Sequence, residues 1–204
     1  MIHQGERILL KWFRKKTTTI VAFDMQLNTL NEIGIKLKSS LNIELLFEHF
    51  SQEEMEKDPY TMLLVSLGSE VEMDNKFDFI SDDIWHLDTE CIEDHGDYQR
   101  IIQRLVQLTK GSLKITEIND YIDIDNEEVW ISFNINGEVV KHDLRVEDDW
   151  LDLSILGILN SVVTKQNLEK KYYYAVLGQD ILIGFYAEEQ VRKINKLITK
   201  IHFE

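Results

Sequence analysis

The sequence predicts an α+β protein in which antiparallel sheets are built from hairpins, with helices packed on one face. Two observations lead to this prediction. The C-terminal half alternates pairs of strand-like segments with helical segments, in the order strand, strand, helix, strand, strand, helix (ββαββα). The clearest strand pair surrounds Asn136-Gly137, and both residues accept the positive φ angles that a two-residue hairpin turn requires.

The chain shows no sign of a flexible linker. Its one proline and nine glycines are not gathered in one stretch, and 44% of its 204 residues are hydrophobic, which is enough to bury a large core. We therefore expect one compact unit over 1–204, or two packed subdomains, 1–95 and 96–204, without a flexible joint.

The N-terminal segment is predicted to hold two strands and a helix. Residues 6–14 and 18–23 are apolar stretches on either side of a polar turn, although 6–14 also fits a helix. Apolar residues and one glycine then recur at helical spacing from Leu27 to Leu41. Asp24 is placed to cap that helix.

The segment that follows is less regular. Residues 43–49 fit either a strand or a helix. Residues 51–54 have the form of a capping box and predict a short helix that ends at Pro59. The apolar run 60–67 predicts a buried strand, and an acidic turn region is expected at 68–76.

The segment 84–92 alternates as a β-strand and carries the residues best suited to chemistry. Its polar face and the loop after it hold imidazoles and carboxylates, which bind divalent cations or act as acid and base. This candidate metal site consists of His86, Asp88, Glu90, Asp94 and His95. Side chains on one strand face run parallel, so a solvent-facing polar surface is the simpler interpretation. Cys91, on the apolar face, is expected to be a small core residue.

Asp97 is placed to cap the best amphipathic helix of the chain, residues 98–111. The face of this helix that we expect to contact water consists of Arg100, Gln103, Arg104 and Gln107. Two short strands are predicted after it, near 113–118 and 121–125.

The hairpin at Asn136-Gly137 has a predicted register, because turn chemistry and face pattern agree. On the buried face, Ile135 pairs with Glu138, Phe133 with Val140, Ile131 with His142 and Val129 with Leu144. On the other face, Trp130 pairs with Asp143, Ser132 with Lys141 and Asn134 with Val139. We expect His142 to be a core residue.

Three further elements complete the C-terminal half. Asp152 is placed to cap a broadly buried helix over 153–164. Residues 172–186 predict a second hairpin, which turns at Gly178-Gln179 or at Gln179-Asp180. In the first case Tyr173 lies across from Gly184 and its ring can cover that glycine. A last amphipathic helix is expected over 188–200.

Composition and motifs limit the classes of protein to which the chain can belong. A single cysteine excludes an internal disulfide and a multi-cysteine zinc site. The sequence has neither a standard signal segment nor an apolar run of about eighteen residues, so we expect a cytoplasmic protein that does not enter a membrane. It also lacks the common nucleotide-binding, hydrolase and zinc-protease motifs, which weighs against an enzyme, and no cofactor is expected.

The negative charge is concentrated in the middle of the chain. Residues 61–152 hold 7 basic and 23 acidic residues, a net charge of −16. The whole chain carries −15, so the rest of the chain is almost neutral. Such a field repels nucleic acid and attracts a basic protein or cations, although it also serves plain solubility.

Three segments carry a resemblance. They are DTECIEDHGDY at 88–98, NGEVVKHDLRVEDDWLD at 136–152 and LGQDILIGFY at 177–186. Together they resemble a largely uncharacterised family of small acidic bacterial cytoplasmic proteins, some of which are associated with toxin-immunity loci. The resemblance covers roughly the C-terminal 120 residues. It implies that the first two segments lie close together in space. It assigns no activity to particular residues.

These observations favour an acidic protein-binding protein, of the kind represented by an immunity or antitoxin-type inhibitor of a basic effector. The expected contact residues are Asp94, Asp97, Glu147, Asp148 and Asp149, with Trp150 as an aromatic anchor or else a core residue. The alternatives are a metal-dependent hydrolase that uses the cluster at 86–95, and a structural or regulatory module without a small ligand.

Overall fold

The computed structural model describes residues 20–48, 50–73 and 76–204. Within these ranges it confirms the α+β class, with six α-helices and eight strands in antiparallel sheets. The predicted C-terminal order of elements is also confirmed. Its members are β5 (Glu128–Ile135), β6 (Glu138–Leu144), α5 (Ser154–Lys165), β7 (Lys171–Leu177), β8 (Asp180–Tyr186) and α6 (Glu188–Leu197).

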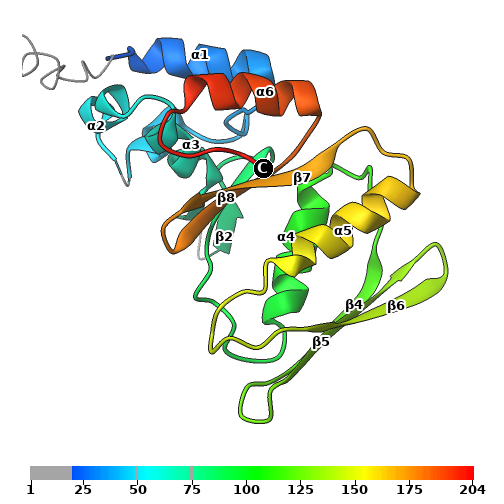
Figure 1. Cartoon of the computed structure of the whole chain (residues 1–204). Helices are drawn as coiled ribbons and strands as arrows, with labels where there is room; N and C mark the ends of the chain where they lie inside the picture. The colour runs from blue at the N-terminus through cyan, green and yellow to red at the C-terminus, as the bar shows by residue number, and fades with distance from the viewer. Residues whose placement is uncertain (1–19, 49, 74–75) are drawn as a thin grey trace, which may run out of the picture.

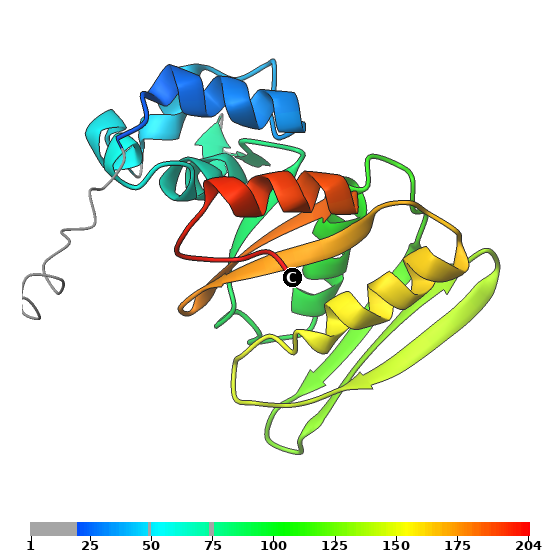
Figure 2. The same ribbon diagram turned by 45° about the horizontal axis from the view of Figure 1, so that its top comes forward.

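Sheets and helices alternate in layers, as Figure 1 shows. The central sheet has the order β3-β8-β7 and the outer sheet the order β4-β5-β6, where β3 spans Ile84–Asp88 and β4 spans Thr116–Asp123. Helices α4 (Asp97–Leu108) and α5 lie between the two sheets. Figure 2 shows α6 on the opposite face of the central sheet, beside α1 (Phe23–Ile33). The outer sheet therefore carries helices on one face, and the central sheet on both.

Two hydrophobic cores lie on either side of the central sheet. One core joins Trp85, Leu87 and Ile183 to α4, α5 and the outer sheet. The other joins Ile84 and Leu182 to the N-terminal helices and α6. Both cores thus draw residues from before and after residue 95, and the division into 1–95 and 96–204 stays a prediction.

The N-terminal part consists mainly of helices. The predicted strand 18–23 is wrong for the residues described, because 20–22 have no regular structure and α1 begins at Phe23. The predicted strand 6–14 lies outside the described residues. Helix α1 begins after Ala22, so Asp24 sits in its first turn and does not cap it, and the chain turns at Gly34, whose φ of 101° favours glycine.

The ambiguous segment 43–49 contains a 3₁₀-helix, η2 (Ile43–Phe47). The capping box is confirmed at the start of α2 (Gln52–Lys57), because Glu54 N–H donates to Ser51 Oγ and Ser51 N–H donates back to Glu54 Oε2.

The predicted strand 60–67 is wrong, because residues 61–67 form nearly all of helix α3 (Thr61–Gly68). Nearly all of its residues are buried, so the apolar run shows no periodicity that could distinguish a helix from a strand. Gly68 allows α3 to approach β3 closely, since a Cβ atom there would lie 2.6 Å from the main-chain nitrogen of His86. The expected turn region 68–76 contains β1 (Glu70–Met73) and the start of β2 (Lys76–Phe79).

The β5–β6 register is confirmed at all seven predicted pairs. The two strands predicted at 113–118 and 121–125 are instead the single strand β4. A bulge between Thr116 and Asn119, with Glu117 at a φ of 51°, interrupts the alternation on which the prediction depended.

The second hairpin turns at Gly178-Gln179, because Leu177 pairs with Asp180, and Tyr173 lies across from Gly184 as predicted. The ring that covers Gly184 belongs to Tyr186, however, so the covering role expected of Tyr173 is wrong. The two residues lie on the same face of β8, and a side chain at 184 would collide with that ring.

Arg104 does not contact water as expected. It is buried in α4, and its guanidinium donates hydrogen bonds to the carbonyls of Ser81 (2.8 Å) and Ile84 (3.2 Å). The group also lies 3.4 Å from the centroid of the Phe79 ring. Burial lowers the pKa of Arg104 to about 10. No helix in the described ranges is long and apolar enough to span a membrane.

Candidate functional site

Main-chain hydrogen bonds bring the two acidic segments together. The amides of Cys91 and Ile92 both donate to the carbonyl of Asp149, at 3.0 and 2.9 Å, and Leu151 N–H donates to the Thr89 carbonyl at 2.7 Å. The proximity that the resemblance implies is therefore confirmed. We call the surface formed by residues 88–97 and 147–150 the acidic corner.

Asp152 holds this corner against the helices. Its carboxylate accepts hydrogen bonds from the amides of Arg145 (2.8 Å) and Ser154 (2.9 Å), and its own amide donates to the Tyr98 hydroxyl at 2.9 Å. Helix α5 begins at Ser154, and Leu153 occupies its N-cap position without a side-chain cap hydrogen bond. Asp152 therefore does not stand at the cap position predicted for it, although its carboxylate accepts from the first helical amide. Burial by itself raises the pKa of Asp152, but the hydrogen bonds from the two amides outweigh it and lower the pKa.

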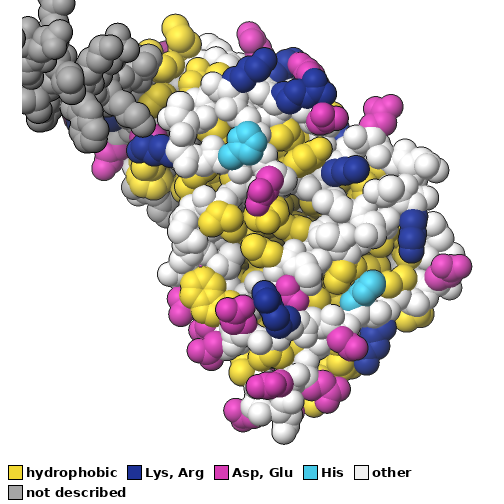
Figure 3. All heavy atoms as spheres, viewed as in Figure 1, with side chains coloured by type: hydrophobic (Ala, Val, Ile, Leu, Met, Phe, Trp, Pro, Cys, Tyr) yellow, Lys and Arg dark blue, Asp and Glu magenta, His cyan; other side chains and the backbone are white. Residues whose placement is uncertain are grey.

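The residues after Arg145 form the exposed part of the corner. Glu147 and Asp148 are exposed, Asp149 is half-buried, and Trp150 has 38% of its surface exposed. Of the two interpretations of Trp150, the exposed anchor fits this position better than the core residue. A cavity of about 610 Å³ lies beside the indole, lined also by Thr89, Arg145, Glu147, Leu151, Asp152, Leu153 and Ser154. Acidic side chains gather over the β6–α5 loop in Figure 3.

The two expected contact residues at the start of α4 differ in their role. Asp97 Oδ2 accepts hydrogen bonds from the amides of Glu93 (2.9 Å) and Asp94 (3.0 Å), so this carboxylate closes the loop. It does not cap α4 as expected, because Gly96 occupies the cap position and Asp97 is the first helical residue. Asp94 is exposed and stays available to a partner.

The residue that caps α4 is Asp120, on β4. Its carboxylate accepts hydrogen bonds from the amides of Gly96 (2.8 Å) and Gln99 (3.0 Å). Local sequence patterns could not reveal this contact, because the acceptor follows the helix start by more than twenty residues and no motif links the two.

The residues of the candidate metal site do not converge. His86 Nε2 lies 3.5 Å from Asp180 Oδ2, whereas His95 Nδ1 accepts a hydrogen bond from the Ile122 amide, and the His95 ring packs on Tyr121. Asp88 and Glu90 lie close together because both accept hydrogen bonds from the Gln179 amide group, at 2.9 to 3.1 Å. Within the described ranges no group of three His, Cys, Asp or Glu side chains could hold a metal ion.

Cys91 is half-buried within the segment 88–97 of the corner. Burial raises the pKa of its thiol to about 11, so almost none of it is thiolate at neutral pH. This position agrees with the expected role of a small core residue.

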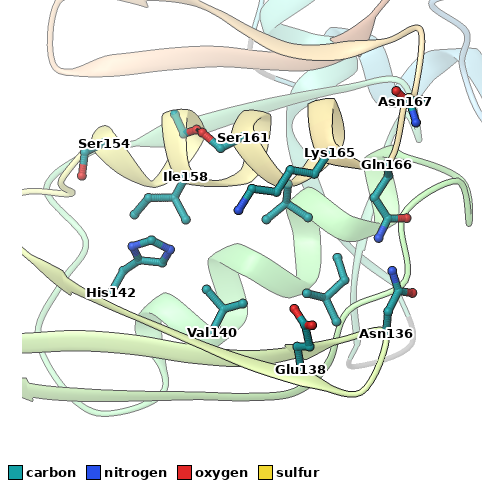
Figure 4. Close-up of a pocket in the computed structure, with 13 residues that line it drawn as sticks. Asn136, Glu138, Val140, His142, Ser154, Ile158, Ser161, Lys165, Gln166 and Asn167 are labelled. Carbon is teal, nitrogen blue, oxygen red and sulfur yellow. The ribbon is translucent and has the colours of Figure 1, made fainter.

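A second cavity, of about 810 Å³, lies between α5 and β6 (Figure 4). His142, expected in the core, lies on the predicted inner face but is only half-buried, because α5 does not cover this part of β6 and the ring lines the cavity. Gly157 and Lys165 of α5 line it as well. Neither stood out in the sequence, because a cavity between a helix and a strand depends on how the layers stack.

Searches against protein-family models, curated proteins and solved structures found no match to this chain. The resemblance to the immunity-associated family stays a prediction.

Proposed function

We propose that this protein binds a basic protein partner through the acidic corner, as an immunity or antitoxin-type inhibitor does. The observation that carries the proposal is the set of main-chain hydrogen bonds between Thr89–Ile92 and Asp149–Leu151. They join two acidic segments, distant in sequence, into one surface around the exposed indole of Trp150.

The charge of this surface supports a binding role. In the described part of the chain its carboxylates form one ion pair with a basic side chain, between Glu147 and Arg145 at 3.5 Å, and both groups are well exposed. Asp94, Asp148 and Asp149 have no basic partner there, so most of the negative charge is available to a partner. Unneutralised charge of one sign accelerates association with a partner of opposite charge and disfavours nucleic acid.

Trp150 supplies an anchor of the kind that dominates binding energy. Tryptophan is enriched among the few interface residues whose truncation costs most of the affinity, and such residues pair with pockets that exclude water. The half-exposed indole beside a cavity fits that description. A bacterial, cytoplasmic setting belongs to the same proposal. The hydrolase alternative gains no support, since its five residues do not converge.

The test compares three forms of the full chain as bait in lysate from its source organism. The corner variant carries Glu147→Gln, Asp148→Asn and Asp149→Asn. The control carries Asp24→Asn, Glu32→Gln and Glu44→Gln, which are exposed residues on another part of the molecule with the same total charge change. The captured protein is then purified and its Kd is measured by calorimetry with each form.

We expect the wild type and the control to capture the same basic protein, and the corner variant to bind it at least about tenfold more weakly. Trp150→Ala should weaken binding to a similar extent. Equal affinity for all forms, or no specifically captured protein, would contradict the proposal and favour a structural module.

A further inference from the structure

The groove between α5 and β6 is built from one face of a helix and alternate residues of an edge strand. Figure 4 shows side chains from both elements pointing into it. The strand contributes Glu138, Val140 and His142, and the helix contributes Ser154, Gly157, Ile158, Ser161, Val162 and Lys165. The helix positions are three and four residues apart, so they share one face.

The main chain of β6 has a free edge along this groove. β6 is the end strand of the outer sheet, and the pairing of Ile135 with Glu138 at the turn sets which residues bond to β5. In a two-residue hairpin the residues that flank the turn form a hydrogen-bonded pair, and every second residue after them does the same. The N–H and C=O groups of Val139, Lys141 and Asp143 therefore point outward, and none of them bonds to another described main-chain group outside the sheet.

Two other sheet edges are less open to an added strand than β6. The chain's own C-terminal residue pairs with β7, where Tyr174 and Glu204 exchange hydrogen bonds of 3.1 and 2.9 Å. On the opposite edge of the outer sheet, β4 has a bulge, which disrupts regular pairing. β6 pairs without a bulge over seven residues, and Val139 at its edge is 71% exposed. An unpaired, regular edge is a template for an added strand.

The lining of the groove indicates what such a strand carries. Val140, Ile158 and Val162 give it an apolar surface, and a Cβ atom at Gly157 would meet no atom within 4 Å, so the helix leaves space there. In Figure 4 the Lys165 ammonium extends over this surface, and it forms no ion pair with a described carboxylate. Glu138 lines the strand side of the groove, so the preference for an acidic side chain applies to the helix side, where Lys165 lies.

We propose that this groove binds an extended peptide segment of a partner protein, with apolar residues at alternate positions and an acidic side chain for Lys165, as a strand added to β6. At about 3.3 Å per residue, seven residues of β6 accommodate a segment of about five to seven residues. This site is independent of the acidic corner, which is proposed to bind a basic surface.

The probe is an amidated heptapeptide with valine at positions 2 and 6 and glutamate at position 4, so that all three side chains share the face that meets the groove, and it is titrated into the isotope-labelled full chain. We expect amide resonance shifts concentrated at Val139, Lys141 and Asp143, with slower hydrogen exchange at these amides. A peptide methylated on the nitrogens that face β6 should bind at least about tenfold more weakly, as should one with lysine in place of glutamate.

Two matched variants separate the groove from the fold. Gly157→Leu fills the open space and replaces a helical glycine, so it should keep the chain folded and weaken the peptide at least about tenfold. Thr164→Leu changes an exposed residue of the same helix outside the groove and should leave affinity unchanged. The corner variant should also bind the peptide normally, which distinguishes failure here from failure of the proposed function.

Three results would overturn this inference. They are no resonance shift at millimolar peptide, equal binding of the methylated peptide, and equal binding by Gly157→Leu. Sedimentation that shows the chain dimerising through β6, with loss of the dimer on Val139→Pro, would assign the edge to a second copy instead and would also overturn it.

Discussion

Arg104 illustrates how a single buried charge joins three elements. Its guanidinium lies on the Phe79 ring at the end of β2 and bonds two carbonyls around the start of β3, while its backbone belongs to α4. Nothing in the helical periodicity separates it from Arg100, which is exposed on the same helix. The difference arises because the segment 79–84 lies over α4 at this point, and that contact is a property of the tertiary structure.

We expect Arg104→Met to lower the free energy of unfolding by about 2 kcal/mol, because it leaves the carbonyls of Ser81 and Ile84 without their donor. Arg100→Met is the matched control and should change stability by less than about 0.5 kcal/mol. Urea unfolding of both variants measures the difference. Equal stability of the two would mean that the buried guanidinium contributes nothing net.

At the scale of elements, the β5–β6 hairpin and helix α3 mark the limits of prediction. The hairpin could be predicted pair by pair, because its turn residues and its alternation are both local signals. Helix α3 could not, because it is buried on nearly every side and only its packing against β3 distinguishes it from a strand. The acidic corner was only partly predictable. Its acidic segments were visible, and their contact was implied by resemblance alone.

The start of α4 depends on a cap supplied by another element. Asp120→Ala removes the acceptor for the amides of Gly96 and Gln99, and should destabilise the protein by about 1–2 kcal/mol. Hydrogen exchange at those two amides should accelerate at the same time. Asp125→Ala, in the exposed turn after β4, is the control and should change neither quantity. Unchanged exchange at Gly96 and Gln99 in the Asp120 variant would contradict this role.

At the scale of the whole molecule, burial of protonated groups makes the fold sensitive to alkaline pH. Burial raises the pKa of Cys91 to about 11 and of Tyr98 to about 12, and it also raises the pKa values of Tyr172 and Tyr186 above the ordinary value. Each group keeps its proton in the folded chain at a pH where the unfolded chain has lost it. Their contribution is complete below pH 9 and is lost as the pH rises. Arg104, whose pKa is lowered, acts in the opposite sense above pH 10.

Four groups against one predict that stability falls above about pH 9–10, by about 1.4 kcal/mol per pH unit for each net proton. Urea midpoints measured between pH 8 and pH 11 test this. Tyr186→Phe removes one of the four groups and should reduce the slope of stability against pH by the contribution of one proton. A midpoint that stays constant to pH 11 would show that these groups are not buried in solution.

The central claim about the whole molecule is that the acidic corner binds a basic partner. The most direct measurement is the association rate constant with the captured partner as a function of ionic strength. We predict a steep fall with salt for the wild type and for the Asp24/Glu32/Glu44 control, and a much shallower fall for the Glu147/Asp148/Asp149 variant. The same salt dependence in all three forms would show that the corner does not steer the partner, and would contradict the claim.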